Sequence, residues 1–146
     1  KISEFHSPET HLLPIVINKI IKNKNIYIYG DNYNTLDGTC IRDYVHVQDL
    51  AEAHIAAMGF VEKSEAGFTA INIGTGSGAS VFEVLSMIQD VTGISIDPII
   101  GQRREGDPAA LVADVSFAKD VLVWQSSRNL RDIVTSAWAA WQLGHK

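Results

Sequence analysis

The sequence predicts an α/β fold made of short strands and several helices. Two short runs rich in β-branched or aromatic residues, 26–29 and 69–73, each end at a glycine, as strands commonly do. Each run is followed along the chain by a segment with apolar residues at helical spacing. The chain has 146 residues, of which 46% are hydrophobic and 20% charged, and this is typical of one globular domain spanning residues 1–146.

The first part of the chain predicts two helices separated by a strand. Residues 10–23 carry apolar side chains at helical spacing, and the strand at 26–29 follows them. A polar loop at 31–39 leads to an extended segment at 42–47. Asp49 is placed to serve the N-terminal turn of the next helix. The apolar face of that helix is predicted to carry Leu50, His54, Ala57, Met58 and Val61.

The middle of the chain predicts a strand, helix and strand in succession. After the strand at 69–73, Ser80 and Glu83 form the pattern of a capping box, which opens a helix. Gly93 is placed to end that helix. The next strand is predicted at 96–100, so that a βαβ unit would span residues 69–100.

Two helices are predicted at the end of the chain. A short one follows Asp114, and a longer one runs from Asn129 to Gly144. The inward face of the longer helix is predicted to carry Leu130, Ile133, Val134, Ala137, Trp138 and Trp141. We expect the third tryptophan, Trp124, to lie in the core as well.

Composition excludes several classes of function. The net charge of -5 argues against a nucleic-acid partner. The single cysteine, Cys40, cannot form an internal disulfide, which favours a reducing, cytoplasmic location. No apolar run reaches membrane-spanning length, so no membrane is expected as a partner. The histidines are scattered without a metal-ligand pattern, and we expect no metal site: they are His6, His11, His46, His54 and His145. His46 and His54 are interpreted as structural.

A glycine-rich turn at residues 74–79 has two possible interpretations. Its sequence fits the pattern G-x-G-x-x-A between a strand and a helix, and Asp97 follows about 20 residues later, as in a dinucleotide-binding fingerprint. Alone, this pattern suggests NAD. The alternative is a tight turn that allows a helix to pack closely on its strand.

Arginines and carboxylates gather in two places. Residues 103–108, with the sequence RREGDP, surround a glycine turn after a strand, and guanidinium groups match phosphate oxygens in two-point contacts. Arg42 and Asp43 have the same combination. Either place is a ligand site or a solvated charged turn with internal ion pairs.

The string GTCIRDYVHVQDLAEAH at residues 38–54 is highly specific, and with it the chain resembles the UDP-glucose 4-epimerases of the extended short-chain dehydrogenase family. Further matches are PETHLLP at 8–14, NIGTG at 72–76 and RREGDPA at 103–109. The resemblance implies the C-terminal portion of a Rossmann-like fold. It also implies that the glycine-rich turn is not the cofactor fingerprint.

The resemblance implies a set of nucleotide contacts. Arg42 and Arg104 would clamp the diphosphate, and Asp107 would accept hydrogen bonds from the ribose hydroxyls. The backbone of the strand from Tyr27 to Tyr29 would meet the uracil.

The same resemblance implies four further contacts. Leu12 would lie near the nucleotide, and Val81 near the base and ribose. His11 stands where some members have a phosphate-contacting asparagine. Leu111 would line the hexose pocket, where its intermediate size implies a preference for UDP-glucose and UDP-galactose with tolerance for some N-acetylated sugar.

The family's reaction removes a hydride from sugar C4 to NAD and returns it to the opposite face, using a Tyr-x-x-x-Lys base system. Neither that motif nor Gly-x-x-Gly-x-x-Gly occurs in this sequence, so it holds no catalytic residue and no cofactor-binding residue of the family. The sequence also opens with Lys1 rather than methionine. We therefore expect the substrate-binding half of an isomerase of galactose or surface-sugar metabolism, inactive without an N-terminal NAD-binding half.

This interpretation has one structural consequence and three alternatives. Without the NAD-binding half, apolar surface would be exposed, so homodimerisation or strand exchange is expected. The alternatives are another nucleotide-sugar epimerase or dehydratase, a stand-alone nucleotide-sugar-binding module, or a degenerate remnant that binds no ligand. Departures from the family are Phe117 in place of lysine, Val123 in place of glycine and Ser126 in place of proline.

Overall fold

The computed structural model describes residues 7–144 and confirms the α/β fold class. The elements follow one another in the order α1 (Leu12–Ile21), β1 (Tyr27–Tyr29), β2 (Ile41–Arg42), α2 (Val47–Val61), β3 (Ala79–Ser80), α3 (Val81–Thr92), β4 (Ile99–Gly101), β5 (Ala110–Leu111), α4 (Ser116–Leu122) and α5 (Leu130–Gly144). None of the strands among these residues exceeds three residues. Helices therefore supply most of the regular structure, as the sequence predicts.

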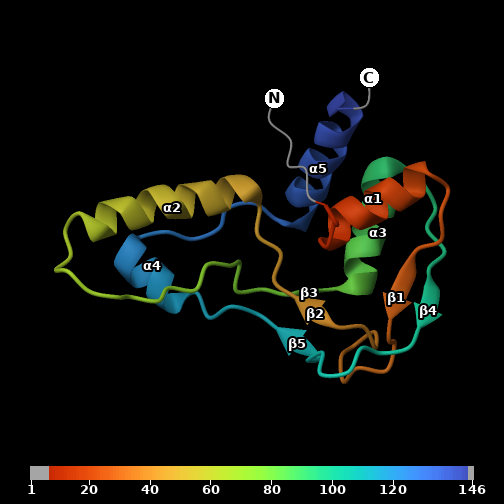
Figure 1. Ribbon diagram of the computed structural model, residues 1–146, viewed down its shortest axis with the longest axis horizontal. Coiled ribbons are helices and arrows are strands. Elements are labelled where there is room, and N and C mark those ends of the chain that lie inside the picture. Colours follow the sequence, from red (N-terminus) through yellow and green to blue (C-terminus); the bar gives the residue numbers. More distant parts are fainter. Residues whose placement is uncertain (1–6, 145–146) are drawn as a thin grey trace.

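The strands form two small sheets (Figure 1). In one, β1 pairs with β4 in parallel. In the other, β2 lies between β3, which is antiparallel to it, and β5, which is parallel. The register of the second sheet places Arg42 opposite Leu111. Two residues far apart in the sequence are thus neighbours at the ends of parallel strands.

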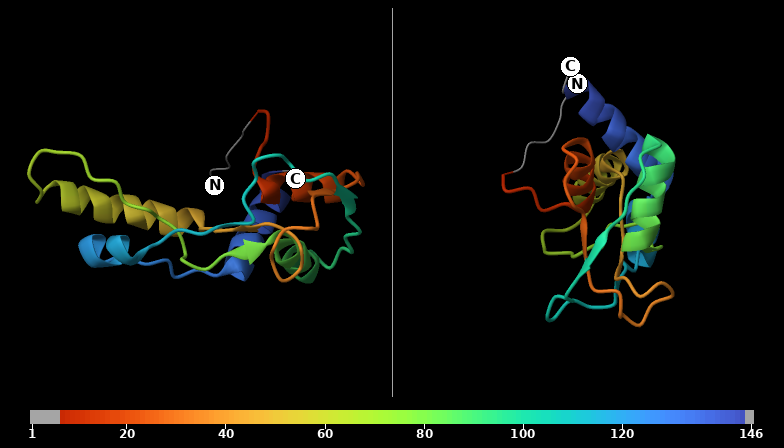
Figure 2. Two further views of the ribbon diagram at one scale, coloured as in Figure 1. Left: turned by 90° about the horizontal axis from the view of Figure 1, so that it is seen from below. Right: turned by 90° about the vertical axis from the view of Figure 1, so that its right-hand side faces the viewer.

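Apolar side chains gather in two clusters at opposite ends of the molecule (Figures 1 and 2). The larger cluster lies between α1, β1, α3 and α5, and Val84, Ile88 and Val134 at its centre have 0% exposure. The smaller cluster joins α2 to α4. It includes Trp124, which is buried as predicted. Burial of apolar side chains in two separate places gives the elongated shape seen in Figure 1.

The ends of α3 agree with the sequence pattern. The Ser80 side chain accepts a hydrogen bond from the Glu83 amide at 3.1 Å, and the Glu83 carboxylate accepts one from the Ser80 amide at 2.7 Å, so the capping box is present. Gly93 ends the helix at φ 72, in the left-handed region that glycine adopts freely. Local residues therefore determine where this helix begins and ends.

The predicted face of α5 is also confirmed. Val134 is fully buried and Ile133 is half-buried against the larger cluster. Trp138 and Trp141 are half-buried and stack on each other, with 5.7 Å between ring centroids. Their spacing of three residues puts both rings on one side of the helix.

The prediction for α2 is confirmed at its start, where Asp49 lies in the first turn, but wrong for most of its face. His46 is the N-cap, and its Nδ1 accepts a hydrogen bond from the Gln48 amide at 3.0 Å. Asp49 lies inside the first turn and is completely buried, whereas His54, Met58 and Val61 are exposed. The reason is that α2 packs on α4 through small side chains such as Ala53, leaving the larger apolar residues outside. The His54 ring pairs with the Leu50 carbonyl oxygen at 2.7 Å.

The predicted strand at 69–73 and the βαβ unit built on it are also wrong. Within the described part of the chain, no strand pairs with residues 69–73, although Ile71 and Ile73 pack on the smaller cluster. The strand before α3 is β3, which runs antiparallel to β2. A β-branched run becomes a strand only when another strand is available for its hydrogen bonds.

Val123 offers a first prediction because its backbone is in the left-handed region, at φ 52, where it caps α4. A β-branched residue in this conformation is strained by about 1–2 kcal/mol. Glycine removes that strain but raises the entropy of the unfolded chain by about 0.4–1 kcal/mol. We expect Val123→Gly to raise the free energy of unfolding in urea by about 0.5–1 kcal/mol.

Asn23 provides the matched control for Val123. It is exposed and has a similar φ of 48, but asparagine tolerates the left-handed region better than valine does. Asn23→Gly is therefore expected to stabilise less than Val123→Gly. Equal gains at the two positions would show that strain at Val123 is not the cause.

Candidate functional site

An ion pair between Arg42 and Asp107 forms the centre of the candidate site. Arg42 ends β2, and its Nη2 donates to Asp107 Oδ1 from the loop after β4. The Arg42 Nη1 donates to the Ile41 carbonyl oxygen at 2.6 Å. The two charged side chains keep 23% and 28% of their surface exposed. The pair is thus held by the fold but remains open to a ligand.

The rings of two tyrosines contact the two consecutive arginines in the loop after β4. The Arg104 guanidinium lies 4.2 Å from the centroid of the Tyr29 ring, and the Arg103 guanidinium lies 4.0 Å from that of Tyr33. A cation over an aromatic face is attracted by the electrons of the ring. The Tyr33 hydroxyl also donates to Asp107 Oδ2 at 3.2 Å. Arg104 is therefore held at the outer edge of β1 while Arg103 is held over Tyr33.

The glycine-rich turn at 74–79 surrounds a carboxylate of the protein itself. Asp43 accepts hydrogen bonds from the amides of Thr75 at 2.9 Å, Gly76 at 3.1 Å and Ala113 at 3.3 Å. A Cβ at Gly74 would lie only 2.5 Å from Asp43 Oδ2, so glycine is needed for this close approach. The amides that a cofactor phosphate would use at such a turn are engaged with Asp43, in agreement with the tight-turn interpretation.

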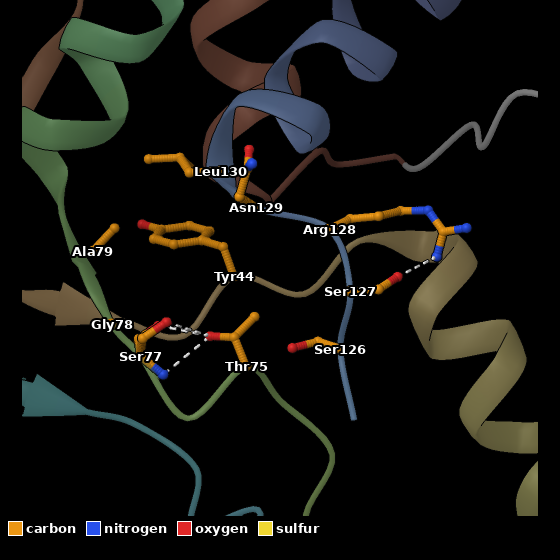
Figure 3. Close-up of a pocket in the computed structure, with 10 residues that line it drawn as sticks. All are labelled: Tyr44, Thr75, Ser77, Gly78, Ala79, Ser126, Ser127, Arg128, Asn129 and Leu130. Carbon is orange, nitrogen blue, oxygen red and sulfur yellow. Dashed lines mark hydrogen bonds between the residues drawn. The ribbon is translucent and has the colours of Figure 1, made fainter. Parts of the chain in front are cut away.

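Two clefts lie near these residues. The first, of about 390 Å³, is lined by Arg42, Asp43, Asn72, Ile73, Leu111, Val112, Ala113 and Asp114. The side chain of Leu111 in β5 is 62% exposed beside Arg42. The second cleft, of about 290 Å³, lies between the glycine-rich turn and the start of α5, and Tyr44 projects into it (Figure 3). Burial raises the pKa of Tyr44 to about 12, so its hydroxyl stays protonated at neutral pH.

The remaining predicted site residues are spread over three elements. His11 is the N-cap of α1, and its Nδ1 lies 2.8 Å from Glu9 Oε1. Leu12 begins α1 and Val81 begins α3, and both pack partly against the larger apolar cluster. The side chains of Tyr27 and Tyr29 point outward from β1 while Ile28 between them is buried. Of the predicted set, the structure brings together Arg42, Asp107 and Leu111. Arg104 belongs to the same loop as Asp107, and its guanidinium lies over the Tyr29 ring.

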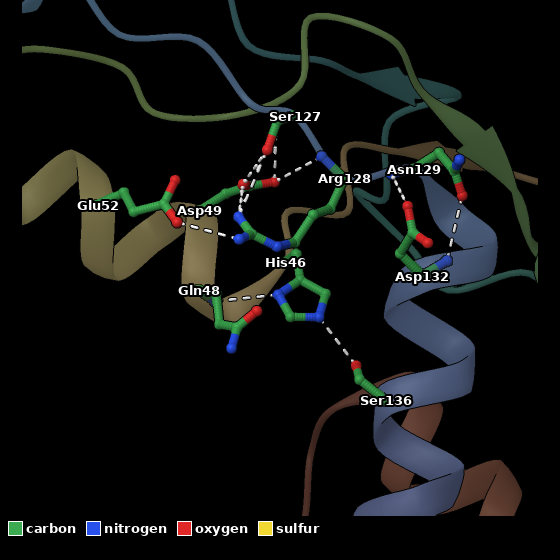
Figure 4. Close-up of polar contacts among 9 residues, drawn as sticks. All are labelled: His46, Gln48, Asp49, Glu52, Ser127, Arg128, Asn129, Asp132 and Ser136. Atoms are coloured by element: carbon green, nitrogen blue, oxygen red, sulfur yellow. Dashed lines mark hydrogen bonds and ion pairs between the residues drawn. The ribbon is translucent and has the colours of Figure 1, made fainter.

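A second polar network joins the start of α2 to the loop before α5 (Figure 4). The buried Asp49 carboxylate accepts hydrogen bonds from the Arg128 guanidinium and amide and from Ser127. Burial opposes ionisation of Asp49, but these hydrogen bonds outweigh it and lower its pKa. Glu52 binds the other guanidinium nitrogen of Arg128 at 3.0 Å.

The structural interpretation of His46 is confirmed in the same network. Its Nδ1 caps α2, and its Nε2 lies 2.9 Å from Ser136 Oγ in α5. One ring nitrogen thus caps α2 and the other contacts α5, so that the imidazole connects the two helices (Figure 4). Asn129 and Asp132 reciprocally cap α5, at 2.9 and 3.1 Å.

Sequence reasoning missed Tyr33 and the Asp49–Arg128 pair. Tyr33 is an isolated aromatic residue between two asparagines in a polar loop, a pattern that could have marked it as anchored. No local signal joins Asp49 to Arg128, because 79 positions separate them.

Residues 7–144 include no group of three or more His, Cys, Asp or Glu side chains that could hold a metal ion. In the same range, the helices are too short or too polar to cross a membrane.

The fold and the site define an α/β protein with a basic and acidic cluster at strand ends, and comparison with known proteins identifies its family. The sequence profile of the NAD dependent epimerase/dehydratase family matches residues 2–74, half of the chain. The chain therefore belongs to this family.

Curated relatives and solved structures narrow the likeness to UDP-glucose 4-epimerases. The chain is 42% identical over 146 residues to the UDP-glucose 4-epimerase of Lactobacillus helveticus, covering 99% of this chain and 44% of that protein. It matches the Brucella ovis UDP-glucose 4-epimerase solved with NAD at a TM-score of 0.88 and 39% identity, over 97% of this chain and 44% of that one.

A third likeness is to the Bifidobacterium longum UDP-glucose 4-epimerase solved with NAD+ and UDP. The TM-score is 0.84 and the identity 38%, over 92% of this chain and 40% of that one. These findings confirm the resemblance seen in the sequence. The chain spans less than half the length of the curated relatives it matches.

Proposed function

We propose that this chain is the UDP-hexose-binding half of a UDP-glucose 4-epimerase that interconverts UDP-glucose and UDP-galactose. The observation that carries the proposal is the Arg42–Asp107 pair at the end of β2, together with Arg104, which comes from the same loop as Asp107 and lies over the Tyr29 ring. A nucleoside diphosphate sugar offers phosphate oxygens for guanidinium groups and ribose hydroxyls for a carboxylate. Relatives solved with UDP or with UDP-sugars support this choice of ligand.

Each proposed contact uses hydrogen-bonding capacity that the internal contacts leave available. A carboxylate has about four acceptor sites, and Arg42 and Tyr33 use two of those on Asp107. Two sites remain for ribose hydroxyls. A guanidinium has about five donors, so Arg42 can hold Asp107 and Ile41 and still donate to a phosphate. Leu111, exposed in β5, then presents an apolar wall to the hexose.

The residues present do not fit NAD. The amides of the glycine-rich turn are bound to Asp43, and at Gly74 the space that a pyrophosphate would need is filled by that side chain. We therefore propose that another region of the enzyme, an N-terminal half, holds NAD and supplies the catalytic base. The outer face of α2 suits such a partner, since Val47, Ile55 and Met58 are 71%, 69% and 65% exposed.

We expect this chain alone to bind UDP but to show no epimerase activity. Calorimetric titration should give a dissociation constant below about 1 mM, equivalent to about -4.1 kcal/mol, because the proposed nucleotide contacts all lie within the chain. A coupled assay with UDP-galactose and added NAD should stay at the buffer blank.

The epimerase of Lactobacillus helveticus, assayed in parallel, is the positive control for turnover. Absence of UDP binding would refute the proposed substrate site. Turnover by this chain would show that its own residues complete an active centre and would refute the proposed division of labour.

A further inference from the structure

Tyr33 is a buried residue that contacts the proposed site. Only 4% of its surface is exposed, although it belongs to a polar loop between β1 and β2. Its hydroxyl donates to Asp107 Oδ2 at 3.2 Å, and the face of its ring lies under the Arg103 guanidinium. Burying a tyrosine with its hydroxyl directed at a carboxylate joins the loop to the site by two contacts of different kinds.

The loop around Tyr33 is built to hold it in place. The Tyr33 amide donates to the Gly38 carbonyl at 2.8 Å, and the Thr35 amide donates to the Tyr33 carbonyl at the same distance. Gly38 has φ +81, and a Cβ there would lie 1.9 Å from the Asp31 carbonyl oxygen. A Cβ at Gly30 would lie 2.9 Å from the Tyr33 ring itself. Two glycines thus allow the backbone to close around this side chain.

We propose that Tyr33 is a positioning residue of the nucleotide site, which fixes the Asp107 carboxylate in the orientation that accepts the ribose hydroxyls. This inference rests on the proposed function. Arg42 holds Oδ1 of the carboxylate and Tyr33 holds Oδ2, so that rotation about the Asp107 side chain is opposed from both sides. With either donor absent, the carboxylate gains alternative orientations, and part of the binding free energy is used to restrict them.

The hydroxyl is available as a donor throughout the neutral pH range. Burial, together with the hydrogen bond to Asp107, raises the pKa of Tyr33 above its ordinary value of 10.0. It therefore remains protonated at the pH at which nucleotide binding is measured. An ionised carboxylate has no proton to donate. The Tyr33 hydroxyl is therefore the donor in this hydrogen bond, and Asp107 is the acceptor.

The test compares two ligands and two Tyr→Phe variants of this chain by calorimetry. The ligands are UDP and a UDP analogue whose ribose lacks both hydroxyls. Tyr33→Phe keeps the ring under Arg103 and removes only the donor to Asp107. We expect it to weaken UDP binding about three- to tenfold, the effect of losing one hydrogen bond, while changing affinity for the analogue by less than about twofold.

Tyr44→Phe is the matched control, because it removes a phenol hydroxyl in the neighbouring cleft rather than in the proposed site. It should leave both affinities unchanged. If the role of Tyr33 were merely structural, Tyr33→Phe would weaken the binding of both ligands equally. Tyr33→Leu, which removes the ring as well as the hydroxyl, is expected to weaken both. Circular dichroism and urea unfolding establish that each variant is folded.

The outcomes separate the inference from the function on which it rests. If the unaltered chain binds no UDP, the proposed function fails and the inference fails with it. If UDP binds but Tyr33→Phe leaves its affinity unchanged, or weakens both ligands equally, the positioning role is refuted while the proposed function stands. If the unaltered chain binds UDP and the analogue equally, Asp107 does not contact the ribose, which also refutes the inference.

Discussion

Replacing Asp49 by asparagine is expected to lower the free energy of unfolding by about 1.5–3 kcal/mol, the usual effect of losing a hydrogen bond to a charged group, because Arg128 is 27% exposed and keeps Glu52 as a partner. The Asp49 carboxylate is completely buried and accepts hydrogen bonds from Ser127 and from the amide and guanidinium of Arg128. Asparagine removes the charge opposite Arg128 and places an NH₂ donor among other donors. A single domain is typically stable by about 5–15 kcal/mol, so this loss is a substantial fraction of the total.

Urea unfolding of the two variants Asp49→Asn and Asp90→Asn compares the loss of unfolding free energy at the buried carboxylate with the loss at a matched exposed one. Asp90 pairs with Arg131 at 3.2 Å, but both side chains are 56% exposed, and such pairs contribute less than about 1 kcal/mol. The expected order is a large loss at Asp49 and a small one at Asp90. Similar losses at the two positions would mean that the buried network does not hold α2 to the loop before α5.

The free energy of unfolding at low pH gives an independent test of the contribution of the Asp49 carboxylate. The pKa of Asp49 is lowered in the folded protein from its ordinary value of 3.8, so the folded state favours the ionised form. Its stabilising contribution is present above that ordinary value and is lost as pH falls through the lowered folded value. The difference in unfolding free energy between the unaltered chain and Asp49→Asn should therefore narrow in acid.

Elements whose ends depend on neighbouring residues could be predicted from the sequence. The capping box of Ser80 and Glu83, with Gly93 twelve positions after the first helical residue, fixes α3 by contacts within a few positions. The apolar spacing of α5 likewise gave the buried position of Val134. In these cases propensity, capping and apolar pattern all favour the same structure.

Elements that depend on distant partners could not be predicted in this way. The sequence places Asp49 in the first turn of α2, but no local signal shows that Arg128, 79 positions away, binds it there. The run 69–73 has strand composition without a strand to pair with in the described part of the chain. The glycine-rich turn matches a phosphate-binding pattern, and only the fold shows that Asp43 fills it.

The candidate site illustrates both cases. Arg42 and Asp107 were implied by family resemblance and are brought together by the fold, although 65 positions separate them. The sequence alone assigns no role to Tyr33, because an isolated tyrosine in a polar loop suggests an anchored side chain but does not show which residues it contacts. Its contacts with Arg103 and Asp107 arise only when the loops after β1 and β4 meet.

We expect Arg42→Ala and Arg104→Ala each to weaken UDP binding by about tenfold to a hundredfold, which corresponds to about 1.5–3 kcal/mol for hydrogen bonds to a charged group. Arg42→Ala should lie at the upper end, because it also removes the donor that holds Asp107 Oδ1. Arg104→Lys should recover only part of the loss. Lysine restores the charge but neither the two-point geometry nor the contact of a guanidinium with the Tyr29 ring.

Calorimetric titration of UDP and uridine into the same variants shows whether the arginines act on the diphosphate. Uridine lacks the phosphates, so Arg104→Ala should change its affinity by less than about twofold, whereas the loss for UDP stays large. Arg131→Ala, in the exposed pair with Asp90, controls for the removal of one positive charge from this acidic chain. If Arg131→Ala weakens UDP binding as much as Arg104→Ala does, general electrostatic attraction rather than a clamp would account for the affinity. Unchanged UDP affinity in both Arg42→Ala and Arg104→Ala would leave the cluster as an internally paired charged turn.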